Sequence, residues 1–254
     1  MELLFPIIIF VGGIIGGLYG SMVGSAGLLS VPLLILIGLP IHMAVATTRP
    51  AAAVLELVSA ARYHQEGKLP RPLLKRGLFL GIVAAIGASI GANMIIATNE
   101  QSLRLIFSIV IFGMFLLLVS KNKWGLEERT IHSKHDVVIA ITALLIGIYG
   151  GFFGFAFGTL FAIPLIAIGY TFLQGAVISR IAGAIMSSTA AAIFIANDLV
   201  NYPYAISLAA GFAIGAWVGA GIGAKKGNRF IKILMISIIM ISVIKLVVDF
   251  VLAT

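Results

Sequence analysis

Two arginines stand deep inside apolar stretches of the sequence. Arg49 and Arg180 each lie roughly nine residues into an apolar segment, 41–61 and 172–196, away from any cluster of charge. An arginine near the centre of a bilayer costs at least ~2.5–3.5 kcal/mol on insertion scales, so it requires compensation. Its planar guanidinium group suits two-point recognition of an oxyanion. We expect the two arginines to line a central cavity and bind a small anion. The alternative is that each snorkels or forms a structural pair.

Hydroxyl side chains accompany both arginines. They are candidate hydrogen-bond donors to the anion, although hydroxyls in membrane helices often bond only to the backbone of their own helix. These residues are Thr47, Thr48, Ser179 and Ser187.

Glu56 is the candidate acid of the same region. It follows Arg49 by seven residues, which places both on roughly the same face of a helix. It is suited to balance Arg49 or to carry a coupling proton, and it is equally compatible with a place near the cytoplasmic end in water. Its counterpart in the second half of the chain is near Ser187, so it is not a symmetric feature.

Glycine-rich stretches suggest helices that break at membrane depth. The stretch 12–32 contains seven glycines within an apolar segment, and 147–164 repeats its pattern. Because broken helices expose backbone N–H groups, and helix N-termini attract anions, we expect both breaks to contribute to the anion site. The candidate residues at the breaks are Gly24, Ser25, Gly27, Gly154 and Gly158. The four-residue spacing of glycines in 211–223 and 87–91 instead predicts close helix packing.

Enzymatic and metal chemistry find no support in the sequence. It contains no H-E-x-x-H, G-x-S-x-G or P-loop pattern. Cysteine is absent, and His132 and His135 lie in a charged linker, where we expect surface residues and not metal ligands. We therefore expect neither an enzyme nor a bound cofactor or metal, and transport driven by ATP would need another chain.

Composition identifies the class of protein. The chain of 254 residues is 61% hydrophobic and 10% charged, whereas about 25% charged is usual for a soluble domain. An integral membrane protein is therefore predicted. The net charge of +8 reflects a cytoplasmic Lys/Arg bias and not affinity for nucleic acid.

The two halves of the chain are related by duplication. Gly17-Leu18-Tyr19-Gly20 returns as Gly147-Ile148-Tyr149-Gly150, and Arg49 returns as Arg180, at a nearly constant offset. We predict an all-α fold with two repeats of about five helical segments each. The apolar segments fall near 3–23, 25–39, 41–61, 77–97, 103–120, 137–157, 158–170, 172–196, 204–224 and 230–252. The domains are a first repeat at 1–120, a cytoplasmic linker at 121–136 and a second repeat at 137–254.

The distribution of positive charge indicates that the repeats are inverted. Most Lys and Arg residues gather in 62–76, 121–134 and 225–232, whereas 97–102 and 197–203 contain none. The basic regions should be cytoplasmic, and corresponding loops of the two repeats then lie on opposite sides. Five full spans per repeat satisfy this pattern, and so do three spans plus a re-entrant hairpin. Both arrangements place the N- and C-termini outside the cell.

These features resemble the sulfite exporter TauE/SafE family of membrane permeases. The resemblance rests on GGLYGSMVGSAGLLSVP and IGIYGGFFGFAFGTLFAIP, each followed by a helix with small residues, hydroxyls and an arginine, and covers nearly the whole chain. It implies a secondary transporter in the plasma membrane that moves sulfite, sulfonates or sulfoacetate outward. The second repeat has FFGFAFG where the first has MVGSAG, so the two breaks differ.

We therefore expect alternating access, with one repeat rocking against the other around an anion at the midplane. The expected partners are that anion and the lipid bilayer, and a homodimer is compatible with the sequence. An anion channel and a non-transporting scaffold or sensor are the alternatives.

Overall fold

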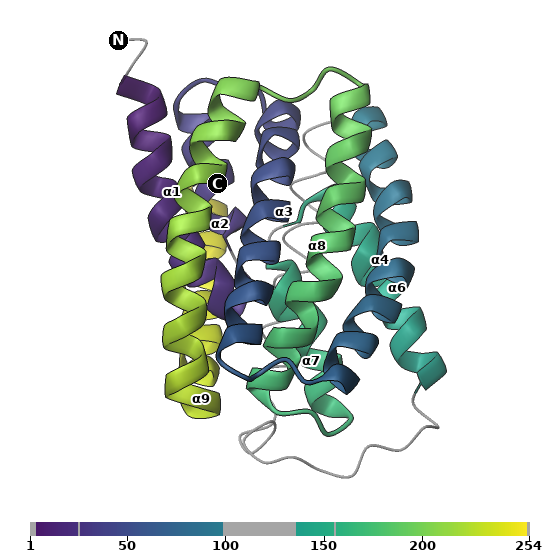
Figure 1. Ribbon diagram of the computed structural model, residues 1–254. Helices are drawn as coiled ribbons and strands as arrows, with labels where there is room; N and C mark the ends of the chain where they lie inside the picture. The colour runs from purple at the N-terminus through teal and green to yellow at the C-terminus, as the bar shows by residue number, and fades with distance from the viewer. Residues whose placement is uncertain (1–3, 25, 99–135, 155, 253–254) are drawn as a thin grey trace.

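The protein is a bundle of α-helices (Figure 1). The computed structural model describes residues 4–24, 26–98, 136–154 and 156–252, and every regular element in these ranges is a helix. The predicted all-α fold is confirmed. The predicted segment 103–120 and the linker, except Asp136, lie outside the described residues. The helices are α1 Leu4–Val23, α2 Gly27–Leu36, α3 Ile41–Gln65, α4 Arg71–Ala97, α6 Asp136–Phe152, α7 Phe157–Ala167, α8 Phe172–Ala196 and α9 Tyr202–Leu252.

Several helices are built to cross a membrane. Within the described residues, α1, α4, α8 and Tyr202–Leu234 of α9 are long and apolar enough to do so. Large apolar side chains stand exposed in rows on the outer helices, including Ile82, Ile86 and Ile90 on α4. Exposed apolar surface of this extent is unfavourable in water and is expected against lipid. The chain is accordingly a multi-pass membrane protein.

The two glycine-rich regions form helical hairpins. In Figure 1, α1 runs inward from the upper end and α2 returns to that end, whereas α6 enters from the lower end and α7 returns there. The 10 residues of α2 and the 11 of α7 extend only about 15–16 Å, half the ~30 Å of a hydrocarbon core. Each of the short apolar segments 25–39 and 158–170 therefore forms a half-helix and not a minimal span, whereas α1 is long enough to cross the hydrocarbon core.

The two halves run in opposite directions. α3 descends and α4 ascends in Figure 1, whereas the corresponding α8 ascends and α9 descends. This arrangement is consistent with inverted repeats. The α3–α4 connection and the kink at Gly227 lie at the same end of the bundle, so basic regions 62–76 and 225–232 gather there as the charge pattern predicts.

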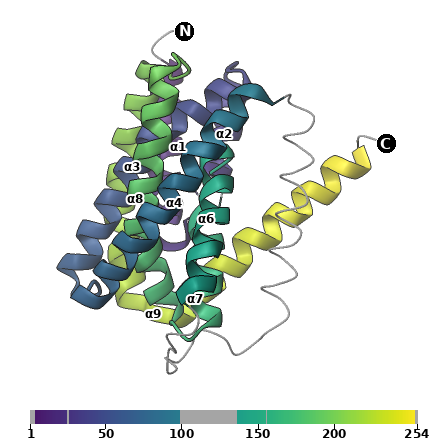
Figure 2. The same ribbon diagram turned by 90° about the vertical axis from the view of Figure 1, so that its right-hand side faces the viewer.

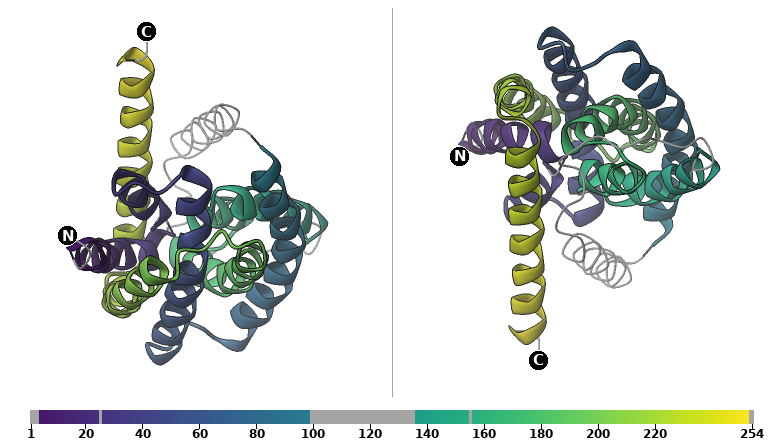
Figure 3. Two further views of the ribbon diagram at one scale, coloured as in Figure 1. Left: turned by 90° about the horizontal axis from the view of Figure 1, so that it is seen from above. Right: turned by 90° about the horizontal axis from the view of Figure 1, so that it is seen from below.

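Helix packing divides the described helices into two bodies. α9 packs against α1 and α3, and α2 packs against α1 and α3. In the same way, α4 packs against α6 and α8, and α7 packs against α8 and α6. We call α1, α2, α3 and α9 the first body, and α4, α6, α7 and α8 the second body. Their largest mutual contact is between α3 and α8, at the centre of the views in Figure 3. Each body contains one helix from the opposite half of the sequence.

Glycines allow the closest helix contacts within the bodies. A Cβ on Gly211 or Gly215 of α9 would collide with the α1 backbone, at Phe10 O and Ile14 O. A Cβ on Gly87 or Gly91 of α4 would collide with the backbone of α6 in the same manner. The predicted packing role of these glycine series is therefore confirmed.

The last helix consists of two stretches. Gly227 has φ +71° and ψ −163°, which interrupts α9 between the predicted segments 204–224 and 230–252. Only glycine adopts such an angle readily. Beyond Gly227 the helix path diverges from the bundle (Figure 2).

Candidate functional site

The breaks of the two hairpins touch each other at the interface between the bodies. Gly24 follows α1 with φ +75°, and its carbonyl accepts a hydrogen bond from the backbone N–H of Gly158 (3.2 Å). The hydroxyl of Thr159 donates to the carbonyl of Val23 (2.5 Å). A Cβ on Gly24 would lie 2.7 Å from the backbone nitrogen of Gly158. The glycines at the breaks therefore permit direct backbone contact between the two halves.

Arg180 on α8 has a saturated set of partners. Its side chain is fully buried, and its Nη1 donates to the carbonyl of Gly20 (2.7 Å). Its Nε donates to the carbonyl of Ala176 (3.3 Å), and its Nη2 donates to the hydroxyl of Ser179 (3.1 Å). Nη1 also lies 3.0 Å from Oε2 of Glu56 on α3. Arg180 thus has both hydrogen-bond acceptors and a counter-charge.

Arg49 on α3 lies at the other break with fewer partners. It is 2% exposed, and its Nη2 donates to the carbonyl of Phe153, just beyond the end of α6 (2.5 Å). Gly154, with φ +63°, makes room for it, because a Cβ there would occupy the position of the guanidinium group. α3 continues through Pro50, whose ring nitrogen cannot donate to the carbonyl of Ala46.

Each half of the sequence supplies the arginine that caps the other half's broken helix. Arg180 binds Gly20 O in the last turn of α1, and Arg49 binds Phe153 O just beyond α6. The last carbonyls of a helix carry partial negative charge, so a guanidinium group stabilises them; Gly20 O also accepts from the backbone N–H of Gly24 (2.7 Å). The sequence suggested helix N-termini as the polar feature of the breaks, whereas the arginines hold C-terminal carbonyls.

The hydroxyl candidates have varied partners. Thr48 donates to Val45 O (2.7 Å), and Ser179 donates to Ala176 O (2.8 Å) while accepting from Arg180. Thr47 accepts from the backbone N–H of Asn201 (3.0 Å) and so holds the α8–α9 connection. Ser187 is 2% exposed on α8. Of the hydroxyl candidates that the structure describes, only Ser179 is hydrogen-bonded to an arginine side chain.

The remaining candidates at the first break are partly described. Gly27 is the first residue of α2, just after the break between α1 and α2, and it is half-buried. Ser25 lies outside the described residues.

Glu56 pairs with Arg180 and not with Arg49. It is 7% exposed, so it does not lie in water at the helix end. The facing Gly183 leaves room for it, since a Cβ there would be 2.9 Å from the Glu56 carboxyl carbon. The spacing within α3 places Glu56 and Arg49 on one face, but Arg49 reaches towards the end of α6 whereas Glu56 turns towards α8. Side-chain direction therefore decides the pairing.

Two residues near the site were not among the sequence candidates. Thr159 joins the two breaks through its bond to Val23. Tyr149, next to Arg49, has a buried hydroxyl without a hydrogen-bond partner in the part of the chain that the structure describes. The repeated motif Gly-x-Tyr-Gly was the available signal for Tyr149, and Thr159 carried no signal in the sequence.

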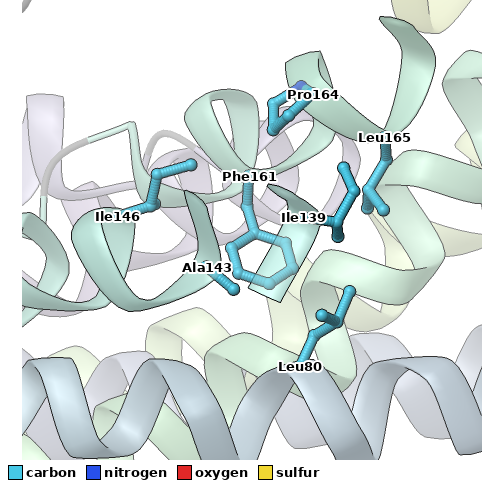
Figure 4. Close-up of a pocket in the computed structure, with 7 residues that line it drawn as sticks. All are labelled: Leu80, Ile139, Ala143, Ile146, Phe161, Pro164 and Leu165. Atoms are coloured by element: carbon cyan, nitrogen blue, oxygen red, sulfur yellow. The ribbon is translucent and has the colours of Figure 1, made fainter. Parts of the chain in front are cut away.

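A small pocket lies apart from the arginines. It is lined by seven apolar residues of α4, α6 and α7, including Pro164, with the ring of Phe161 at its centre (Figure 4). Its side chains offer no donor to an anion. The candidate site is therefore the arginine-capped junction of the two breaks.

Comparison with known proteins shows to which family the chain is similar. The model of a family described as "Sulfite exporter TauE/SafE" matches residues 8–246. A "Probable membrane transporter protein" of Haemophilus influenzae is 21% identical over 243 residues, covering 95% of this chain and 94% of that protein. The "Probable membrane transporter protein YdhB" of Bacillus subtilis is 27% identical over 230 residues, covering 86% and 89%.

The "Probable membrane transporter protein YfcA" of Escherichia coli K12 is 24% identical over 248 residues, covering 97% of this chain and 91% of that protein. No solved structure was found to match the chain. The similarity thus extends over nearly the full length of several membrane transporters.

Proposed function

Because this chain belongs to the sulfite exporter TauE/SafE family, it is a membrane permease and not an enzyme, and we propose that it exports small sulfur-containing anions. Sulfite, sulfonates and sulfoacetate are the proposed cargo. One observation carries the proposal: two buried guanidinium groups from opposite halves of the chain lie where two broken helices touch. Such a junction concentrates positive charge in a water-poor place, which favours an anion over a neutral solute.

The proposed binding place is the junction near Gly24, Gly154 and Gly158. The oxygens of a sulfite or sulfonate group match the donor geometry of guanidinium groups. Arg49 and Arg180 are 2% and 0% exposed, so an anion reaches them only after the protein opens. The structure therefore corresponds to a closed state of a transport cycle in this proposal.

Alternating access is the proposed mechanism, with the two bodies as its moving parts. The α3–α8 contact is the main surface between the bodies, and both arginines stand on these two helices. Rocking at this surface would open the junction to one side at a time. Packing favours these bodies over the two sequence repeats, because α9 packs on the first half's helices and α4 on the second half's.

The driving force and location follow from the class of protein. The sequence lacks an ATP-binding motif, so the substrate gradient, the membrane potential or protons would drive transport. We place the protein in the plasma membrane, with the basic end of the bundle in the cytoplasm and the N-terminus outside.

Transport by purified protein in liposomes tests the proposal. Sulfite under anaerobic conditions, methanesulfonate, sulfoacetate and thiosulfate should each be assayed, with sulfate and acetate as comparison anions. We expect saturable uptake of at least one sulfur anion, and acceleration of labelled uptake when unlabelled substrate is loaded inside. Failure of every sulfur anion to show saturable movement would refute the proposed substrate class. Unitary currents without exchange would establish an anion channel instead.

A further inference from the structure

The two buried arginines differ in their charge balance. Arg180 has Glu56 as its counter-charge at 3.0 Å. Arg49 has no carboxylate within ion-pair distance among the described residues. The position that corresponds to Glu56 in the second repeat is near Ser187, which carries no charge. A buried cation with only one carbonyl as a partner is costly unless an anion joins it.

Two buried donors, one on Arg49 and one on Tyr149, have no acceptor among the residues that the structure describes. Nε of Arg49 is buried and has no hydrogen-bond partner within the described part of the chain, although Nη2 is bound to Phe153 O. The hydroxyl of Tyr149 is likewise buried without a partner there, and the ring of Tyr149 lies 5.9 Å, centroid to centroid, from the ring of Phe153, whose carbonyl Arg49 binds. Buried polar groups are nearly always hydrogen-bonded, so this pair of unpaired donors indicates a missing acceptor.

The duplicated sequence offers an internal comparison. Tyr19 occupies the position of Tyr149 in the first repeat, within the same Gly-x-Tyr-Gly motif. Its side chain is 43% exposed on α1. The first break therefore has a neutralised arginine and an exposed tyrosine, whereas the second has an arginine without a carboxylate among the described residues and a half-buried tyrosine whose hydroxyl is buried. The two breaks therefore differ in the charge balance of their arginines and in the exposure of their tyrosines.

We infer that the transported anion binds at the second break only, between Nε–H of Arg49 and the hydroxyl of Tyr149, and that it carries a single negative charge. Arg180 and Glu56 then form a neutral structural pair that holds α8 against α3 and caps α1. This inference rests on the proposed function and narrows it in two ways. The binding site has one arginine in place of two, and the cargo is restricted to singly charged sulfite and sulfonate ions, which removes sulfoacetate. The inference also adds Tyr149 as a residue that contacts the substrate.

The charge count determines the substrate class. Arg180 and Glu56 sum to zero, so Arg49 leaves one positive charge at the junction. A hydrogensulfite ion or an alkyl sulfonate cancels this charge, with one oxygen for each of the two donors. Sulfate and sulfoacetate carry two negative charges, and the second would remain buried without a cation. We therefore expect methanesulfonate to be bound about tenfold or more tightly than sulfate, since leaving a buried charge unpaired is strongly unfavourable.

The decisive experiment compares two tyrosine variants of the purified full-length protein. Binding of methanesulfonate is measured by titration calorimetry in detergent, and its transport is measured in liposomes. Tyr149→Phe should weaken methanesulfonate binding about tenfold or more, the value of a hydrogen bond to a charged group. Tyr19→Phe is the matched control and should bind as the wild type does. Both variants retain the aromatic ring, and their thermal unfolding curves check that the fold is intact.

The outcomes separate this inference from the proposed function. If the wild type binds and transports methanesulfonate while Tyr149→Phe and Tyr19→Phe behave alike, the second-break site is wrong and the transporter function stands. Equal or tighter binding of sulfate would contradict the single-charge assignment. If the wild type binds none of the sulfur anions, the proposed function itself fails. Loss of methanesulfonate binding in Arg49→Gln, with the fold retained, would support the assignment of Arg49.

Discussion

At the scale of single residues, the ion pair between Arg180 and Glu56 should stabilise the fold. The side chains are 0% and 9% exposed, so removing one partner leaves a buried charge without compensation. Breaking such a pair typically costs about 3–5 kcal/mol. We predict that Glu56→Gln lowers the free energy of unfolding by an amount in this range, measured by denaturation in detergent. We expect the double variant Glu56→Met with Arg180→Met to lose less than the two single variants combined.

A partly exposed ion pair provides the matched control for that prediction. Arg62 in the last turn of α3 and Glu66, the residue just after α3, lie 2.7 Å apart, and their side chains are 23% and 21% exposed. Pairs of this kind contribute about 0–1 kcal/mol. Glu66→Gln should therefore change stability little. Equal effects of Glu56→Gln and Glu66→Gln would show that the buried pair has no special structural role.

The sequence identified these residues better than it identified their partners. The burial of Arg49 and Arg180 could be predicted because arginine is rare in apolar segments. Their acceptors could not, since Gly20 O and Phe153 O are backbone atoms more than 100 residues away in the chain, and backbone atoms carry no sequence signal. The choice of Glu56 between two arginines likewise depended on Gly183, on another helix, which leaves room for the carboxyl group.

At the scale of helices, glycine determines how closely α4 approaches α6 and α9 approaches α1. A Cβ on Gly91 would collide with Ile148 O of α6, and one on Gly215 would collide with Ile14 O of α1. Backbone atoms cannot move aside as a side chain can. We predict that Gly91→Ala and Gly215→Ala each lower the unfolding free energy by about 1–3 kcal/mol or more, the usual cost of overpacking.

Gly12→Ala is the control for the glycine variants. Gly12 also lies within a helix, but its added Cβ would first meet Cδ2 of Leu33, the end of a flexible side chain, at 2.5 Å. The higher helix propensity of alanine, about 1 kcal/mol, then offsets any small adjustment. The unfolding midpoint of the Gly12→Ala variant should stay at or above that of the wild type. If Gly12→Ala loses as much stability as Gly91→Ala, close helix contact is not the reason for glycine at these positions.

The helices themselves were largely predictable, because long apolar segments interrupted by glycine, proline or charge have few alternatives. The hairpins were not, since a short apolar segment such as 25–39 fits either a minimal span or a half-helix. The length of α2 and its return path resolve this choice. The composition of the two bodies also lay beyond sequence reasoning, because the duplication suggests that each repeat packs on itself. Instead α4 and α9 pack on the opposite halves.

At the scale of the whole molecule, the two bodies meet at both ends through corresponding contacts. At one end, Nε2 of His42 in α3 donates to the carbonyl of Thr98, just after α4 (3.0 Å). At the other end, the backbone N–H of Leu173 in α8 donates to Oδ1 of Asn228, just after Gly227 of α9 (2.9 Å). His42 and Leu173 are each the second residue of their helix. We call these contacts the upper and lower latches; both are closed in this structure.

Alternating access between the bodies requires each latch to open in turn. Because the chain contains no cysteine, pairs introduced at the latches would be its only thiols. We predict that a short thiol cross-linker joining His42→Cys to Thr98→Cys stops methanesulfonate transport in liposomes, and that one joining Leu173→Cys to Asn228→Cys does so as well. If the cross-linker contains a disulfide, transport should return when the disulfide is reduced.

The control pair is Arg76→Cys with Asp136→Cys, which replaces a 2.5 Å ion pair between α4 and α6 inside the second body. Joining α4 to α6 does not restrain the α3–α8 surface, so transport should continue. If joining either latch leaves the rate unchanged, or if the control pair blocks transport equally, these bodies are not the parts that move.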